Sequence, residues 1–242
     1  MKQSKVAVVF IGTEKYLNFL PTWYERCEQY LFPELEKRYL VFTDGEVPES
    51  PENASIRKIK HLEWPYITLY RFDIIGQARG EILQYDWLVF LDADMAVVDT
   101  INAEDFFNLD KPFFGVHHPC HFLKFPPHDQ PPGSFETNPL STAKVPEDYD
   151  FSTYWQGCLW GGRVPDVIEM MDELHDRIKI DEKNKVIAQW HDESHINAFY
   201  AENKDLVHTL GPEYAFPEVF ADACDFQPKI VHLAKDNSKY HV

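Results

Sequence analysis

Long apolar runs are missing from this sequence of 242 residues, and their absence limits the classes of protein to consider. No stretch approaches eighteen continuous apolar residues, which argues against a membrane-spanning helix. The first apolar run breaks at 12–14 without a small-residue cleavage pattern, so we interpret it as a strand and not as a signal peptide. We therefore expect a soluble, cytoplasmic protein without an integral membrane segment.

Cysteine is scarce, and the four that occur lie far apart, at Cys27, Cys120, Cys158 and Cys224. They form no Cys-x-x-Cys pair, so neither a zinc knuckle nor a disulfide-exchange motif is indicated. We expect reduced thiols, as in cytoplasmic proteins, while two pairs that meet in space stay an alternative.

Basic residues are also few: the sequence has 23 Lys and Arg but 40 Asp and Glu, which gives a formal net charge of −17. Such a chain repels a phosphodiester backbone, so we expect no nucleic-acid partner. A small phosphorylated substrate stays compatible, provided that a cation or a few placed basic side chains neutralise it. With 44% hydrophobic residues, the chain can bury one sizeable core.

Strand-like and helix-like segments alternate along the chain. Short β-branched and aromatic runs at 5–12 and 38–44 flank a helical candidate around 17–31. The segment 67–85 carries an apolar stripe at helical spacing and precedes the apolar run 87–91. Another helix begins at Pro165, and a last short strand lies near 206–210. This alternation predicts an α/β fold, in which residues 1–242 form a single domain around a central, mostly parallel sheet.

A long proline-rich segment, 119–150, interrupts this pattern. A loop of this length in a compact domain is usually functional, so we expect an ordered wall over a substrate site. The alternative is a tether between two domains, which is disfavoured because Phe122, Phe125, Phe135 and Tyr149 can anchor the segment. The polar C-terminal tail, 233–242, is a second candidate cover for such a site.

Two carboxylates, Asp92 and Asp94, follow the apolar run at 87–91. Ligands of open α/β sheets bind at the carboxyl ends of the strands. Mg²⁺ and Mn²⁺ prefer carboxylate and phosphate oxygens, so this pair suits a cation that also holds a diphosphate. The alternative is a structural turn with Asp99 nearby.

Polar and titratable side chains crowd 190–197, at the start of a predicted helix. One interpretation is a cap, in which Asp192 accepts from free backbone N–H groups while Glu193 and His195 are solvated. Another is a zinc hydrolase that uses His191 and His195, although no third ligand is evident. A third feature, the small-residue run at 157–162 after two aromatics, fits either close approach to a ligand or a bulged central strand.

Together these segments resemble glycosyltransferase family six, the group of the blood-group A and B transferases and the α-1,3-galactosyltransferases. The most specific part is the string Trp-His-Asp-Glu-Ser-His at 190–195. The similarity covers most of the chain and includes 10–16, 39–44, 71–75, 92–94, 115–119, 154–162 and 211–214. It implies a GT-A fold and retaining α-1,3 transfer of galactose or N-acetylgalactosamine from UDP-Gal or UDP-GalNAc to a galactoside acceptor, with Mn²⁺ or Mg²⁺ as cofactor.

The resemblance also implies roles for individual residues, among them Glu193 as nucleophile or as the carboxylate that stabilises an oxocarbenium-like species. The implied donor-binding residues are Phe10, Ile11, Tyr16, Arg71, Asp92, Ala93, Asp94, Gln156, Gly157, Cys158, Asp192 and Lys235, with Asp92 and Asp94 as metal ligands. The implied acceptor-binding residues are His118, Trp190, Asp192 and Glu218. Double displacement and front-face attack both stay open.

Several positions depart from the family pattern. Gln156 and Cys158 match neither blood-group donor pair, which leaves Gal and GalNAc open, and Pro217 replaces an acceptor-contacting Asp. Both acids of the Asp-x-Asp motif are kept, so we expect metal dependence. The chain lacks the anchor and stem of the Golgi enzymes and so resembles the short soluble members from bacteria and phages. A binding module that has lost turnover is the alternative function.

Overall fold

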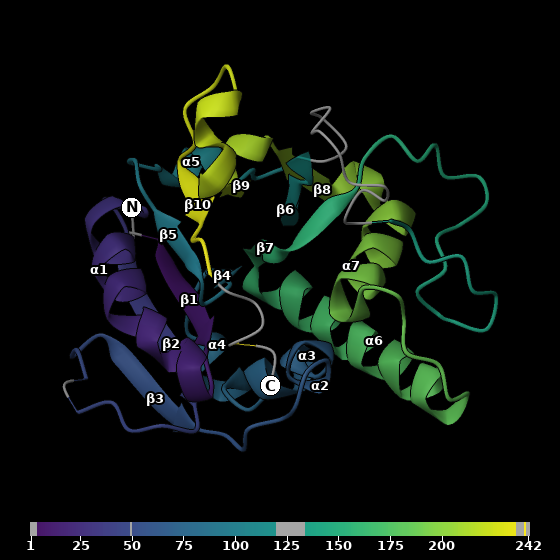
Figure 1. The fold of residues 1–242 in the computed structure, drawn as a ribbon, viewed down its shortest axis with the longest axis horizontal. Coiled ribbons are helices and arrows are strands. Elements are labelled where there is room, and N and C mark those ends of the chain that lie inside the picture. The colour runs from purple at the N-terminus through teal and green to yellow at the C-terminus, as the bar shows by residue number, and fades with distance from the viewer. Residues whose placement is uncertain (1–3, 49, 120–133, 236–239, 241–242) are drawn as a thin grey trace.

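The computed structural model describes residues 4–48, 50–119, 134–235 and 240. Its centre is a seven-stranded sheet in the order β3-β2-β1-β4-β7-β6-β8 (Figure 1). The strands are β1 Lys5–Ile11, β2 Glu36–Thr43, β3 Ala54–Lys58, β4 Trp87–Leu91, β6 Phe113–His117, β7 Trp155–Arg163 and β8 Val207–Leu210. Neighbouring strands are parallel except where β7 lies antiparallel between β4 and β6. The prediction of an α/β fold with a mostly parallel central sheet is confirmed.

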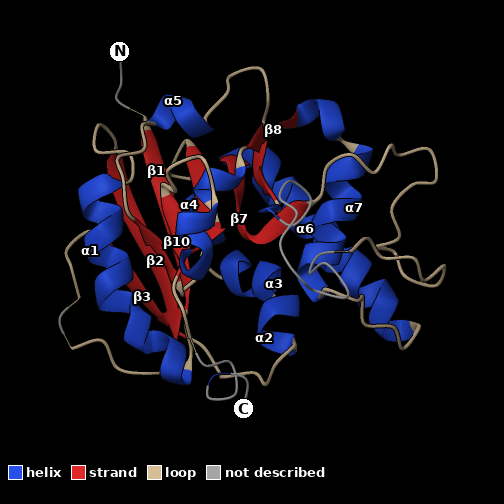
Figure 2. Cartoon of the chain, turned by 45° about the horizontal axis from the view of Figure 1, so that its top comes forward, coloured by secondary structure: helices blue, strands red, loops and turns tan. Residues whose placement is uncertain are grey.

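Helices cover both faces of this sheet, with α1 on one side and α3 and α6 on the other (Figure 2). The helices are α1 Leu20–Tyr30, α2 Tyr66–Leu69, α3 Arg71–Gly76, α4 Arg79–Ile82, α5 Ala103–Phe106, α6 Val164–Lys183 and α7 His191–Glu202. Along β1, Val8 and Phe10 pack on the α1 side while Ala7 and Val9 pack on the other. Because both faces are buried, the central strands are continuous apolar runs in the sequence.

The apolar stripe at 67–85 is buried as expected, but one continuous helix is not what forms there. The chain makes the three short helices α2, α3 and α4, separated at Tyr70 and at 77–78. Tyr70 (φ −96°, ψ 18°) and Ala78 (φ −97°, ψ 9°) lie outside the helical region of backbone space. The spacing of apolar residues predicts which side chains are buried, but it does not predict where the helix is interrupted.

A second, three-stranded sheet brings the C-terminal segment to the carboxyl end of β4. It consists of β5 Met95–Val97, β10 Ile230–His232 and β9 Phe216–Pro217, in the order β5-β10-β9. The strand β10 runs antiparallel to β5, and the Leu233 N–H donates to the Asp94 carbonyl at 2.9 Å. The strand predicted near 206–210 is β8, and the sequence analysis missed β9 and β10. Short 3₁₀ helices complete the described chain, at η1 Glu14–Phe19, η3 Lys204–Leu206, η4 Pro212–Tyr214 and η5 Glu218–Ala223.

Part of the proline-rich segment packs against the domain through aromatic rings. The Phe135 ring lies 5.7 Å from that of Tyr149 and 5.0 Å from that of Tyr154. The other two expected anchors, Phe122 and Phe125, lie outside the described residues, as does most of the tail beyond Lys235. Three cysteines, Cys27, Cys158 and Cys224, are free thiols, and Cys120 is not among the described residues. Among the helices described, none has the length and apolar character to cross a membrane.

Candidate active site

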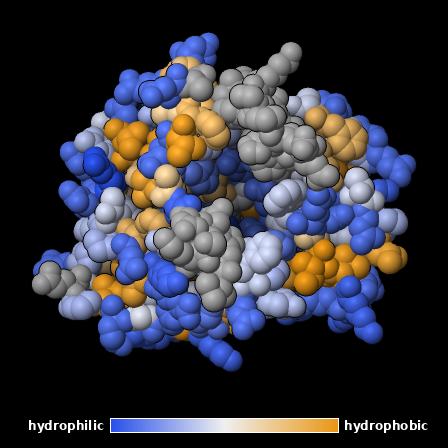
Figure 3. Space-filling view, viewed as in Figure 1, coloured by the Kyte–Doolittle hydropathy of each residue, from blue (hydrophilic) through white to orange (hydrophobic). Residues whose placement is uncertain are grey.

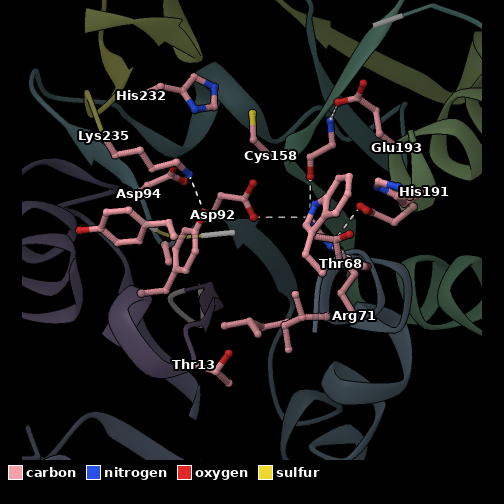
Figure 4. Close-up of a pocket in the computed structure, with 18 of the residues that line it drawn as sticks. Thr13, Thr68, Arg71, Asp92, Asp94, Cys158, His191, Glu193, His232 and Lys235 are labelled. Carbon is pink, nitrogen blue, oxygen red and sulfur yellow. Dashed lines mark hydrogen bonds and ion pairs between the residues drawn. The ribbon is translucent and has the colours of Figure 1, made fainter. Parts of the chain in front are cut away.

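A cavity of about 650 Å³ opens where β1 and β4 end and β7 begins. The face of the molecule seen in Figure 3 is hollowed near its centre, and Figure 4 shows the side chains that converge there. Ligands bind at this end of the strands in open α/β sheets. The predicted donor-site residues that line the cavity are Ile11, Tyr16, Arg71, Asp92, Ala93, Asp94, Gln156, Gly157, Cys158, Asp192 and Lys235, and Glu193 and Trp190 line it as well.

Arg71 is a buried cation that links three segments of this cavity. From the first turn of α3, its Nη1 donates to the Gly157 carbonyl at 2.8 Å. Its Nε lies 3.0 Å from Asp192 Oδ2, and Nη1 lies 3.5 Å from Asp92 Oδ1. The guanidinium also lies over the Phe90 ring, 4.5 Å from its centre. Arg71 is only 5% exposed, and a buried charge is stable only where such partners compensate for its lost hydration.

Asp192 and Asp92, the two carboxyls beside Arg71, have raised pKa values despite this cation. Burial is the largest influence on Asp192 and raises its pKa to about 7, against the lowering effect of Arg71. Burial likewise raises the pKa of Asp92, with Arg71 lowering it and Asp94 raising it. Perturbed carboxyls gathered in a cavity are typical of functional sites.

Asp92 and Asp94 follow directly after β4, and both side chains line the cavity (Figure 4). The Asp92 N–H donates to the Cys158 carbonyl at 2.9 Å, which fixes the start of the motif against β7. The Lys235 ammonium pairs with Asp94 and donates to the Tyr16 hydroxyl, the latter at 2.8 Å. Among the described residues, no three His, Cys, Asp or Glu side chains gather as a metal site, so the chain offers a cation this carboxylate pair. Two hard oxygen donors fit a cation that completes its shell with phosphate oxygens.

Glu193 lies in the first turn of α7 with a hydrogen-bond donor on each carboxylate oxygen. The Tyr154 hydroxyl donates to Oε1 at 2.6 Å and the Gly157 N–H donates to Oε2 at 2.7 Å. Burial raises the Glu193 pKa, and these two donors oppose the rise by stabilising the anion. Gly157 permits this approach, because a Cβ there would lie 3.0 Å from the Glu193 Cβ. The run at 157–162 therefore belongs to the central strand β7, and its first two residues line the cavity. Close approach to a ligand stays a prediction.

The two alternatives for 190–197 gain no support from the structure. The N-cap residue is Trp190, whose N–H donates to Ser194 Oγ at 2.9 Å, and Asp192 pairs with Arg71 instead of capping. His191 lines the cavity, with its ring 4.8 Å from that of Trp64. His195 is buried at 1% exposure, with Nε2 3.7 Å from Asp181 Oδ2 on α6. The two imidazoles face different surroundings, which a zinc site would not allow.

Three predicted residues do not line the cavity. Phe10 is fully buried and its ring packs on Trp23 at 5.2 Å, because alternate β1 side chains point to opposite faces. Its side chain does not line the cavity, and its implied role in donor binding stays a prediction. The His118 N–H donates to the Tyr154 carbonyl at 2.8 Å, and His118 is not part of the lining. Glu218 accepts from the Ala234 N–H at 3.0 Å and also lies outside the lining.

Other lining residues escaped the sequence analysis. Thr13 and His61 lie 2.9 Å apart through Oγ1 and Nδ1, and both face the cavity. Trp64 joins them from the turn before α2, Thr68 from α2 itself, and His232 from the three-residue strand β10. Only Thr13 lies in a segment that carries the resemblance, 10–16, where no role was implied for it. For His232, a three-residue strand has too few residues to show alternation.

Comparison with known proteins agrees with this geometry. The model of Glycosyltransferase family 6 matches residues 1–241. Histo-blood group ABO system transferase 2 of Rattus norvegicus is 28% identical over 244 residues, which cover 97% of this chain and 70% of the relative. Globoside alpha-1,3-N-acetylgalactosaminyltransferase 1 of Homo sapiens is 28% identical over 222 residues, or 88% of this chain and 61% of the relative.

A bacterial relative matches over its length. O-antigen biosynthesis glycosyltransferase WbnI of Escherichia coli is 26% identical over 242 residues, which cover 98% of this chain and 97% of the relative. The observed α/β architecture with its mostly parallel sheet is consistent with the GT-A type expected from the resemblance. The family match spans nearly the whole sequence, and so the chain belongs to glycosyltransferase family 6.

Proposed function

We propose that the protein is a retaining α-1,3-glycosyltransferase that moves Gal or GalNAc from its UDP derivative to a galactoside acceptor, with Mn²⁺ or Mg²⁺ as cofactor. The observation that carries the proposal is the placement of Asp92, Asp94 and Glu193 around one cavity, with Arg71 between them. A diphosphate site and a carboxylate for the anomeric carbon are the two parts that such a transfer needs.

The donor's diphosphate belongs at the end of β4. Asp92 and Asp94 would hold the metal ion, which supplies positive charge against the departing UDP. Lys235 stands at the same point and adds a cation from the C-terminal segment. Ile11 and Tyr16 line the side of the cavity beyond the carboxylates, which suits the uracil ring. A chain of net charge −17 needs this local concentration of positive charge to bind an anionic donor.

Glu193 acts at the sugar's anomeric carbon. The two donors from Tyr154 and Gly157 favour its ionised form and fix its orientation. A fixed carboxylate serves either as nucleophile in a double displacement or as stabiliser of a positively charged species during front-face attack. Trp190, at 36% exposure, offers an apolar face for the acceptor. His118 and Glu218 stay predictions from the resemblance alone, and so does the cytoplasmic location.

The test is UDP release from UDP-Gal and UDP-GalNAc, with lactose and fucosylated lactose as acceptors, with and without Mn²⁺. We expect metal-dependent release and its loss in Glu193→Gln. The matched control is Glu169→Gln on the exposed side of α6, which should keep the wild-type rate. If Glu193→Gln also keeps that rate, the assigned role is wrong. If UDP binds but no acceptor gives product, the alternative of a binding module without turnover replaces the proposal.

A further inference from the structure

Gln156 is a buried amide that is held at both ends. Its Nε2 donates to the Ala215 carbonyl at 2.9 Å, and its side chain is part of a residue only 6% exposed. A carbonyl oxygen accepts only, so the amide nitrogen must face Ala215 and Oε1 must face the other way. On that side, Oε1 lies 3.2 Å from His232 Nε2 and 3.6 Å from Cys158 Sγ. His232 therefore carries a proton on Nε2 and donates it to Gln156.

This tethered amide borders the space where the donor sugar must lie. The Cys158 carbonyl accepts from the Asp92 N–H, and the neighbouring Gly157 N–H donates to Glu193. A sugar that extends from the phosphates at Asp92 to the carboxylate at Glu193 therefore passes the side chains of Gln156 and Cys158. Figure 4 shows Cys158 above Asp92, with His232 to one side of it and Glu193 to the other. In the proposed transfer the anomeric carbon lies at Glu193, beside Gly157, so the substituent on the adjacent C2 comes within reach of Gln156 and Cys158.

Resting on the proposed function, we infer that His232 is a positioning residue that fixes Gln156 and so makes the protein prefer UDP-Gal to UDP-GalNAc. An acetamido group needs more room than a hydroxyl and brings a donor and an acceptor that must be satisfied. Both ends of Gln156 are already engaged, by Ala215 and by His232, so turning the amide to meet that group would break one of these hydrogen bonds. The tether also stops Gln156 from rotating away, and Cys158 takes up the adjoining space.

The experiment compares UDP-Gal with UDP-GalNAc in wild type, His232→Leu, His232→Gln and His208→Leu. Leucine removes the donor, whereas glutamine can present an amide N–H where the imidazole Nε2 stood. His208 is the matched control, because its Nε2 also lies 3.2 Å from a carbonyl oxygen, that of Asp105, but outside the cavity. For each protein, kcat/KM is measured with lactose as acceptor, and the Kd of each UDP-sugar is measured by calorimetry.

We expect wild type to favour UDP-Gal by roughly tenfold or more, the size of discrimination that one misfitted group produces. His232→Leu should reduce this ratio roughly tenfold, mainly by improving UDP-GalNAc, while His232→Gln and His208→Leu keep it. A wild-type preference for UDP-GalNAc overturns the inference. So does an equal loss for both donors in His232→Leu, which marks a merely structural role.

Failure of the proposed function gives a different pattern. If no acceptor is glycosylated but the two Kd values still differ and respond to His232→Leu as described, the proposed transfer is wrong. The inference that His232 fixes Gln156 and sets the donor preference then stands. If neither UDP-sugar binds, both are wrong.

Discussion

Replacing Arg71 by Met tests how far the buried charges of the cavity depend on one another. The substitution keeps an unbranched side chain of similar length but removes the partner of Asp192 and Asp92. Breaking a buried ion pair by removing one partner costs about 3–5 kcal/mol, because the other charge stays buried. In a domain of this size, 1 kcal/mol shifts Tm by about 2–4 °C. We therefore expect Arg71→Met to lower Tm by roughly 10 °C near neutral pH.

The size of this loss should depend on pH in a defined direction. The pKa of Asp192 is already raised to about 7 in the folded protein, above its ordinary value of about 4 in an unfolded chain. The folded state thus binds a proton more readily than the unfolded state, so this group lowers stability as pH rises from about 4 to about 7. Without Arg71, the pKa of Asp192 in the folded protein rises further. The pH range over which Asp192 lowers stability then extends to higher pH. The deficit of Arg71→Met should therefore be smaller at pH 5.5 than at pH 8.

The assay is thermal and urea unfolding at both pH values. Arg79→Met is the control, because Arg79 pairs with Asp172 at 2.8 Å while both side chains are about half exposed, and such surface pairs contribute about 0–1 kcal/mol. Arg71→Met with Asp192→Asn should recover part of the lost stability. Equal losses in the two arginine variants, or a deficit that does not grow with pH, would refute the reasoning.

Three further outcomes follow from the same structure. Tyr154→Phe removes a donor that lowers the Glu193 pKa, so the acidic limb of the kcat/KM profile should move up by roughly one pH unit; an unmoved limb contradicts the role of that hydrogen bond. Lys235→Ala frees a carboxylate of the metal pair, so Mn²⁺ titrated without nucleotide and followed by electron paramagnetic resonance should bind roughly tenfold tighter, while UDP binds more weakly. Gly161→Ala would place a Cβ 2.1 Å from a backbone oxygen of β4 and should cost about 3 kcal/mol or more in urea unfolding, whereas Gly76→Ala meets open space in α3 and should be neutral or stabilising.

The parts of this fold that the sequence predicted well are those with a strong local pattern. The run Trp87–Leu91 is apolar at every position because β4 is buried on both faces, and two acids directly after it mark the strand's end. The helix α6 repeats its core-facing residues over twenty positions, and proline at its start is a local signal too. The local pattern alone therefore places Asp92 and Asp94 at the ligand-binding end of the sheet, where the cavity lies.

Contacts between residues that are far apart in the chain could not be predicted from the sequence. The Arg71 guanidinium meets the Gly157 carbonyl across 86 positions, and no periodicity encodes that contact. His232 reaches the cavity because three residues of β10 pair with β5, too few to stand out by propensity. The burial of Phe10 was hidden for a related reason, since the face to which each β1 side chain points depends on the sheet's register and not on the local motif.

The cavity lies where the sheet changes direction, between the parallel strand β4 and the antiparallel strand β7. The hydrogen bond from the Asp92 N–H to the Cys158 carbonyl, together with Arg71, ties the acidic motif to the start of β7. An insertion or deletion at the start of β7 would therefore displace both together, whereas a change of side chain would not. If the proposed role of this segment holds, point substitutions alone can change the sugar preference, in evolution or by engineering.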